Sequence, residues 1–119
     1  MAKKILVVDD EPMLCEILKD FLELDAYEVS EAHSGKEAFE MIAVDSFDCV
    51  ISDVRMPDGD GAELAQKILN MHGKKPIVFL TTGFSDISDE YAKSLHVVEV
   101  LHKPFVYEEL LSSVRKMVV

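Results

Sequence analysis

The 119-residue sequence contains no tryptophan, only two cysteines and few basic residues. Its 12 lysines and arginines stand against 23 acidic residues, which gives a formal net charge of −11. Sequence-independent binding to nucleic acids or anionic lipids depends on clustered basic side chains, so neither is expected here. The sequence also lacks a run of about 18 apolar residues, as a membrane-spanning helix requires, and a signal-peptide cleavage pattern. We therefore expect a cytoplasmic chain that binds neither nucleic acids nor membranes directly.

The two cysteines, Cys15 and Cys49, lie within otherwise apolar stretches. They form no Cys-x-x-Cys pair and no cysteine–histidine spacing of the kind that holds a metal ion. Because free cysteine behaves as a small buried hydrophobe, we predict that both are buried free thiols.

Short apolar segments recur along the chain and predict five strands. The continuous apolar runs at 5–8, 49–51 and 77–80 are typical of strands covered on both faces. Residues 27–32 alternate between apolar and polar side chains, which predicts a half-exposed strand at one edge of a sheet. Residues 97–101 form a fifth apolar run interrupted by one charge, and we predict that this strand lies at the other edge.

Helical patterns lie between these segments. Pro12 suits the first turn of a helix, and Ser34 with Glu37, like Asp60 with Glu63, has the spacing of a capping box. Apolar residues then recur every three or four positions, which predicts amphipathic helices. In the first helix, the predicted apolar face consists of Leu14, Ile17, Leu18 and Phe21. The short polar segment around 88–95 has the weakest helical pattern.

Five strand–helix units predict an α/β fold with a parallel sheet, helices on both faces and right-handed crossovers. With 49% hydrophobic residues, the composition fits one compact domain over residues 1–119 rather than two. We therefore predict a single doubly wound (βα)5 domain of the flavodoxin-like class. The edge character of the second strand favours the strand order 2-1-3-4-5.

Acidic residues follow two of the predicted strands, at the edge of the sheet where such folds bind ligands. Asp9, Asp10 and Glu11 come directly after the first strand, and Asp53 ends the third. Three ionised aspartates close together repel each other strongly in a partly buried site unless a cation is present. Because Mg²⁺ prefers carboxylate ligands, we predict a magnesium site at Asp9, Asp10 and Asp53.

The fourth and fifth strands add polar groups to the same edge. Thr81 and Thr82 end the fourth strand, and His102 and Lys103 end the fifth. Bonds that precede proline are the peptide bonds that adopt the cis form at modest cost, so Lys103–Pro104 is a candidate cis bond. We expect the Lys103 side chain to point into the site and His102 to point to the opposite side of its strand.

Taken together, these motifs resemble the receiver domain of two-component response regulators. The resemblance rests on residues 5–12, 53–61, Thr81 and 103–105. The four motifs occur in order and span nearly the whole chain, so the combination is far more specific than any one of them. The resemblance implies a phosphoacceptor signalling domain, which is no enzyme in the usual sense and catalyses only its own phosphorylation and dephosphorylation.

In such a domain, Asp53 would accept a phosphoryl group from a histidine kinase or a phosphotransfer protein. The resemblance also implies that Mg²⁺ binds to Asp10, to Asp53 and to the main-chain carbonyl group of Arg55, with Asp9 acting through water. The Asp53 carboxylate is a weak nucleophile, so positioning and charge neutralisation would have to supply the rate.

Further groups would contact the phosphoryl oxygens. The resemblance implies that Lys103 pairs with one oxygen as a point charge and that the Thr81 hydroxyl donates to another after transfer. The main-chain N–H groups of Arg55 and Thr82 would complete the cradle. The Arg55 side chain and Gly83 would flank the attacking water and influence the lifetime of the phosphoryl group.

Family members transmit phosphorylation to the face formed by the fourth helix, fifth strand and fifth helix, where homodimers can also form. A tyrosine or phenylalanine usually swings inward behind the threonine, but Val100 stands at that position and is too small and β-branched for this role. The sequence therefore predicts phosphorylation without the usual aromatic switch. His96 stands where a small residue normally ends the fourth helix, and we expect a left-handed backbone there.

Several alternatives share parts of this chemistry. A magnesium-dependent aspartyl-phosphate phosphatase of the haloacid dehalogenase type needs a second aspartate where this chain has Arg55. A flavodoxin-like cofactor module would have a Ser-, Thr- and Gly-rich loop in place of residues 9–11, and no G-x-x-x-x-G-K-[ST] sequence indicates a P-loop nucleoside triphosphatase. A pseudo-receiver used only for protein contacts stays open as an alternative. The apolar end at 117–119 fits either a free-standing receiver or one followed by an output domain.

Overall fold

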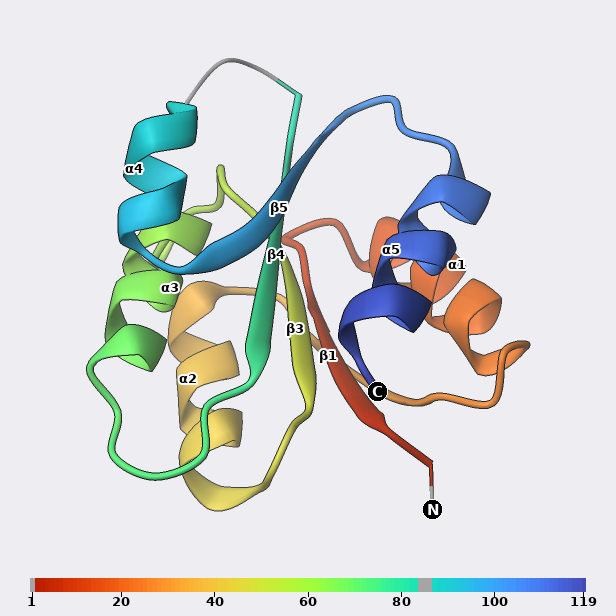
Figure 1. Cartoon of the computed structure of the whole chain (residues 1–119), viewed down its shortest axis with the longest axis horizontal. Helices are drawn as coiled ribbons and strands as arrows, with labels where there is room; N and C mark the ends of the chain where they lie inside the picture. Colours follow the sequence, from red (N-terminus) through yellow and green to blue (C-terminus); the bar gives the residue numbers. More distant parts are fainter. Residues whose placement is uncertain (1, 84–86) are drawn as a thin grey trace.

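The computed structural model describes residues 2–83 and 87–119. Strands and helices alternate along these residues (Figure 1). The strands are β1 (Lys4–Val8), β2 (Glu28–Ala32), β3 (Cys49–Asp53), β4 (Ile77–Thr82) and β5 (Val97–His102). The helices are α1 (Pro12–Glu23), α2 (Gly35–Val44), α3 (Gly61–Leu69), α4 (Asp89–Ser94) and α5 (Tyr107–Met117). The predicted α/β class is confirmed.

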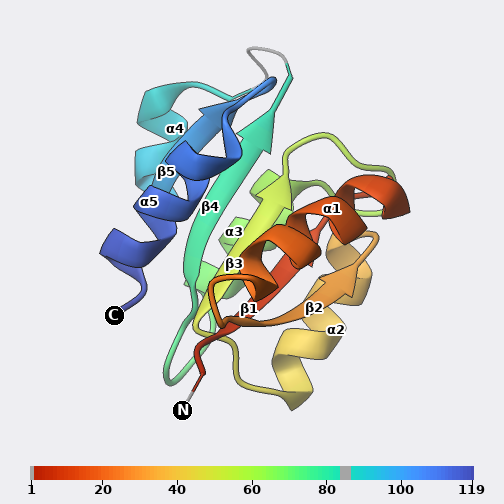
Figure 2. The same cartoon turned by 90° about the vertical axis from the view of Figure 1, so that its right-hand side faces the viewer.

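The five strands form one parallel sheet in the order β2-β1-β3-β4-β5. This is the predicted order, with β2 and β5 at the edges. Helices α2, α3 and α4 cover one face of the sheet, and α1 and α5 cover the other (Figure 1). All the strands run in the same direction, so their carboxyl ends lie at one end of the sheet (Figure 2).

Successive residues of the inner strands pack into two separate cores. In β1, Leu6 and Val8 belong to the core beneath α2, α3 and α4, whereas Ile5 and Val7 belong to the core beneath α1 and α5. Side chains alternate between the two faces of a strand, and here both faces are covered. This burial explains why the inner strands are continuous apolar runs in the sequence.

Ser34 and Asp60, the first residues of the two predicted capping boxes, cap α2 and α3. The Ser34 side chain accepts a hydrogen bond from the Glu37 N–H at 3.0 Å, and Asp60 Oδ1 accepts one from the Glu63 N–H at 2.8 Å. Each cap satisfies an N–H group that has no partner within its helix. Pro12 occupies the first turn of α1, as predicted.

Two details of the helices refine the sequence analysis. Helix α4 has only six residues, in keeping with its weak pattern, and His96 after it has the predicted left-handed backbone with φ of 60°. The prediction that Ile17 lies on the buried face of α1 is wrong, because its side chain is 44% exposed. The buried residues of α1 are Cys15, Leu18 and Leu22, and Ile17 points about 100° away from Leu18 around the helix.

Cys15 and Cys49 are buried free thiols, as predicted. Burial raises the pKa of Cys15 to about 12 and also raises the pKa of Cys49. Both thiols are therefore protonated at neutral pH when no metal ion is bound. Within residues 2–83 and 87–119, no helix combines the length and the apolar character needed to cross a membrane.

Candidate functional site

The carboxyl ends of β1, β3, β4 and β5 bring four of the predicted residues together. Asp9 follows β1, Asp53 ends β3 and pairs in register with Thr81 of β4, and Lys103 follows β5. Asp9, Asp53 and Thr81 are all less than 10% exposed. The parallel topology thus gathers polar residues from distant parts of the sequence into one partly buried site.

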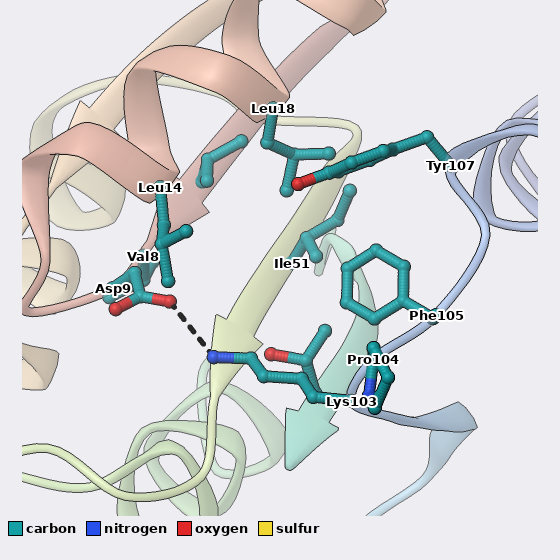
Figure 3. A pocket seen from close by; sticks show the side chains of 11 residues that line it. Val8, Asp9, Leu14, Leu18, Ile51, Lys103, Pro104, Phe105 and Tyr107 are labelled. Atoms are coloured by element: carbon teal, nitrogen blue, oxygen red, sulfur yellow. Dashed lines mark hydrogen bonds and ion pairs between the residues drawn. The ribbon is translucent and has the colours of Figure 1, made fainter. Parts of the chain in front are cut away.

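Lys103 lies between the two buried aspartates. Its Nζ is 3.2 Å from Asp53 Oδ2 and 3.3 Å from Asp9 Oδ2 (the latter contact is shown in Figure 3). The Lys103 side chain is 27% exposed, whereas those of Asp9 and Asp53 are 9% and 11% exposed. The Lys103–Pro104 peptide bond is cis, as expected. A single positively charged ammonium group is therefore shared by two carboxylates that are shielded from solvent.

The pKa of Asp53 follows first from burial and then from the charges of Lys103 and Asp9. Burial raises the pKa of Asp53, Lys103 lowers it, and the neighbouring charge of Asp9 raises it again, so the pKa lies above its ordinary value. Burial also acts to lower the pKa of Lys103, but the two carboxylates outweigh burial and raise it. Lys103 is thus firmly charged, while the Asp53 carboxylate lacks full compensation.

Asp9, Asp10 and Asp53 form the predicted acidic cluster. One carboxylate oxygen from each residue lies within 4.8 Å of the others. Asp9 and Asp53 are buried and Asp10 is exposed, so the cluster is open to solvent on one side. Carboxylate oxygens of this kind fit a hard divalent cation such as Mg²⁺, which retains water and phosphate oxygens among its ligands.

The main chain around Asp53 is held closely in place. Ser52 Oγ donates a hydrogen bond to the Asp53 carbonyl oxygen at 2.9 Å, and the Val54 N–H donates to the Thr81 carbonyl oxygen at 2.9 Å. A Cβ atom added at Gly61 would overlap with the Asp53 carbonyl oxygen. No spacing or motif in the sequence indicated these roles of Ser52 and Gly61.

The remaining predicted residues lie around this centre. The Arg55 main-chain N–H donates to the Asp53 carboxylate, while the Arg55 residue as a whole is exposed. Thr82 is buried, and its carbonyl oxygen accepts a hydrogen bond from the Lys103 N–H at 2.7 Å. Gly83 is exposed at the end of β4. His102 is exposed and is not a member of the acidic cluster.

A cavity of about 440 Å³ adjoins the site on the α1 and α5 side of the sheet. Lys103 and Asp9 lie at one end, and Leu18 and Tyr107 lie at the other (Figure 3). The apolar wall includes side chains from α1, β3 and the segment between β5 and α5. The cavity could not be predicted from the sequence, because its lining residues share no spacing along the chain.

The site geometry agrees with the family comparison. A family model of the response regulator receiver domain matches residues 5–115. The chain belongs to this family. Receiver domains of response regulators are signalling domains of two-component systems and typically act as phosphoacceptors rather than classical enzymes. They interact with histidine kinases or phosphotransfer proteins, and they typically bind Mg²⁺ in an acidic pocket.

Individual relatives extend this comparison. The chain is 32% identical over 126 residues to the transcriptional regulatory protein SrrA of Staphylococcus aureus, which covers 98% of this chain and 48% of the relative. The chain thus spans about half the length of that relative. The solved structure of the response regulator TrrA of Thermotoga maritima with Mg²⁺ and beryllofluoride is 36% identical, with a TM-score of 0.86 over 97% of this chain and 98% of that one.

Another solved structure has the same architecture. The chemotaxis response regulator CheY4 of Vibrio cholerae is 28% identical to this receiver domain, with a TM-score of 0.88 over 98% of this chain and 99% of that one. The flavodoxin-like fold predicted from the sequence is therefore the fold of known response regulators.

Proposed function

We propose that Asp53 is the phosphoacceptor of this receiver domain. The observation that carries the proposal is the contact of Lys103 with Asp53 and Asp9 at the carboxyl end of the central strand. Asp53 is a buried carboxylate with a raised pKa, at the edge of the sheet where doubly wound folds bind ligands. Residues 1–119 would act together as one receiver domain.

In this reaction, an oxygen of the ionised Asp53 carboxylate attacks the phosphorus atom of a phosphohistidine or of a small phosphodonor. The new O–P bond forms an acyl phosphate, and the bond between phosphorus and the leaving imidazole or carboxylate breaks. The Ser52 hydroxyl and the main-chain N–H groups of Val54 and Arg55 hold the chain around the acceptor in position before transfer. Such positioning is a large part of what a domain with a weak nucleophile can contribute.

The acidic cluster fits a magnesium ion for this reaction. Asp10, Asp53 and the Arg55 carbonyl group would hold the ion directly, and Asp9 would hold it through water. A bound Mg²⁺ would offset the repulsion between the carboxylates and the incoming phosphoryl group. The uncompensated charge at Asp53 supports this assignment, because one lysine neutralises only part of the cluster.

Lys103, Thr81 and two main-chain groups would hold the transferred phosphoryl group. Lys103 would share its charge with one oxygen, and the buried Thr81 hydroxyl would donate to another. The N–H groups of Arg55 and Thr82 would complete the cradle. The Arg55 side chain and Gly83, both exposed beside the site, would then affect how fast water removes the phosphoryl group.

Phosphorylation would change the surface formed by α4, β5 and α5, and that surface is where a second receiver could bind. Thr81 pairs in register with Leu101 of β5, so a movement of Thr81 has a direct route to this strand. Val100 packs at the edge of the core beneath α2, α3 and α4. Because residue 100 is a valine and not an aromatic residue, the conformational change would be transmitted through contacts between β4 and β5 rather than through the rotation of an aromatic side chain.

Phosphorylation with acetyl phosphate tests the proposal. Intact-mass measurement with Mg²⁺ present should detect one added phosphoryl group on the wild type and none on Asp53→Asn. Asp58→Asn is the matched control, because Asp58 is exposed in the same loop and asparagine tolerates its left-handed backbone (φ 58°). An unphosphorylated wild type would favour a pseudo-receiver, and phosphorylated Asp53→Asn would overturn the assignment of Asp53.

A further inference from the structure

A second cluster of metal-ligand residues lies next to the Asp9 main chain, at the edge strand β2. Cys15 of α1, Glu31 of β2 and His33, which follows β2, each offer a ligand atom within 4.8 Å of the other two. His33 Nε2 lies 3.5 Å from Glu31 Oε1. Sequence spacing did not indicate this cluster, because Cys15 and the other two residues come from separate elements that only the fold brings together.

The donor atoms of this cluster differ from those of the acidic cluster. A thiolate, an imidazole nitrogen and a carboxylate oxygen form a mixed donor set that suits Zn²⁺ better than Mg²⁺. Zinc–ligand bonds of about 2.0–2.3 Å in a tetrahedron place neighbouring ligand atoms roughly 3.3–3.8 Å apart. The 3.5 Å spacing of the Glu31 and His33 atoms already falls in this range, and the Cys15 sulfur lies within 4.8 Å of a ligand atom of each.

Burial and charge also suit a cation at this place. Cys15 is fully buried, Glu31 is half-buried and His33 is exposed, so an ion would have its sulfur ligand inside and an open side toward solvent. The Cys15 thiol donates to the Asp9 carbonyl oxygen at 3.4 Å and to the Ala32 carbonyl oxygen at 3.8 Å, and a metal ion bound to the sulfur would take the place of this proton. The nearby carboxylates of Asp9 and Asp10 add negative charge.

We propose that Cys15, Glu31 and His33 bind a Zn²⁺ ion, with water as the fourth ligand. As the sulfur–zinc bond forms, the Cys15 thiol loses its proton to solvent, and no oxidation or reduction occurs. The bound ion ties α1 to the edge strand β2, since it joins side chains from both. This site is separate from the acidic cluster and does not depend on the phosphoacceptor role of Asp53.

Cobalt serves as the probe, because Co²⁺ bound to a thiolate has a charge-transfer absorption that Co²⁺ bound only to oxygen lacks. The protein is kept reduced, and Mg²⁺ is present in excess to occupy the acidic cluster. The wild type should develop the thiolate band on addition of Co²⁺ and lose it when Zn²⁺ is added. Zn²⁺ alone should also raise the thermal midpoint, because it binds the folded state.

Two pairs of variants locate the site. Cys15→Ser should abolish the band, while Cys49→Ser, at the other buried thiol, should retain it. Loss of a residue that only hydrogen-bonds to a metal ligand lowers metal affinity about 10- to 100-fold. Because His33 would be a ligand itself, His33→Ala should lower the affinity at least as much. His72→Ala is its control, because His72 is also exposed but lies outside the cluster.

Several results would overturn the proposal. These results include a wild type that develops no thiolate band with Co²⁺ and a Cys15→Ser variant that retains the band. Equal affinities for His33→Ala and His72→Ala would also exclude this site. If Cys15→Ser does not fold, the two histidine variants decide the question, because both replaced side chains are exposed.

Discussion

The two ends of β3 each carry an aspartate that contacts a lysine, yet the two carboxylates have opposite pKa shifts. Asp48 precedes the strand and lies 3.3 Å from the Lys74 ammonium group, and its pKa is lowered. Asp53 ends the strand and lies 3.2 Å from Lys103, and its pKa is raised. The residue types and the distances are nearly the same at both ends.

The difference comes from burial and from the number of carboxylates that share the cation. The Lys4 main-chain N–H donates to Asp48 at 2.8 Å and is the main cause of its lowered pKa; Lys74 contributes less. Asp53 is more deeply buried and shares Lys103 with Asp9. Contact with a lysine therefore does not by itself decide the direction in which the pKa of a carboxylate moves. At the Asp53 end of the strand, the negative charge is only partly neutralised, and a further cation would be bound favourably.

Replacing the lysine at each end of β3 should give the largest difference in the free energy of unfolding. Lys103→Ala leaves two buried carboxylates without the cation that they share, and breaking such a buried ion pair costs about 3–5 kcal/mol. Lys74→Ala breaks a contact whose lysine side chain is 79% exposed, so it should cost less than about 1 kcal/mol. Urea unfolding of both variants without Mg²⁺ measures the difference. Equal losses would show that burial does not separate the two ends.

A methyl group beside Asp53 should have the next largest effect. Gly61→Ala would press against the Asp53 carbonyl oxygen, and such overpacking costs about 1–3 kcal/mol. The shift should also slow phosphorylation by acetyl phosphate, because it moves the acceptor. At Gly83 an added Cβ atom has no neighbour within 4 Å among residues 2–83 and 87–119, so Gly83→Ala should unfold at nearly the wild-type urea concentration. Equal midpoints for the two variants would contradict the close packing at Gly61.

The pH dependence should be the smallest effect and should have opposite signs at the two ends. Carbon-13 NMR should find Asp53 titrating above, and Asp48 below, the ordinary pKa of an aspartate. As the pH falls through the folded-state pKa of Asp53, protonation relieves the buried charge and increases the free energy of unfolding. As the pH falls further, through the folded-state pKa of Asp48, the favourable contacts of that carboxylate are lost and the free energy of unfolding decreases.

Added Mg²⁺ should remove the difference between the pKa shifts of Asp53 and Asp48. A cation at the acidic cluster favours the ionised form of Asp53, so the pKa of Asp53 should fall when Mg²⁺ is added, while that of Asp48 stays constant. If Asp53 titrates below Asp48 without Mg²⁺, or if Mg²⁺ leaves its pKa unchanged, the assigned cause of the difference is wrong.

The fold could be predicted closely because its signals are local. Continuous apolar runs identified the strands buried on both faces, and Ser34 and Asp60 marked two helix starts that the structure confirms. Ile17 was misplaced because the three-and-four spacing describes a broad helix face, whereas the neighbouring elements decide which part of that face is covered. The short α4 was also predicted weakly, since its six residues carry little periodicity.

The candidate site could be predicted as a set of residues but not as an arrangement. Parallel strands bring their carboxyl ends to one edge, so Asp9, Asp53, Thr81 and Lys103 were expected to meet. The sequence could not predict that one ammonium group contacts both aspartates, because side-chain distances depend on how strands from far apart in the chain are packed. The Cys15, Glu31 and His33 cluster and the cavity next to Lys103 had no signal for the same reason.

By itself the sequence determined the alternating elements, the class of sheet, the family and the polar residues at the strand ends, because periodicity, caps and motifs act over a few neighbouring residues. Only the tertiary structure decided which charges are buried, which share a partner and in which direction the pKa of Asp53 moves. Those properties depend on distances through space and on the exclusion of water, and both are set by contacts between residues that are remote along the chain.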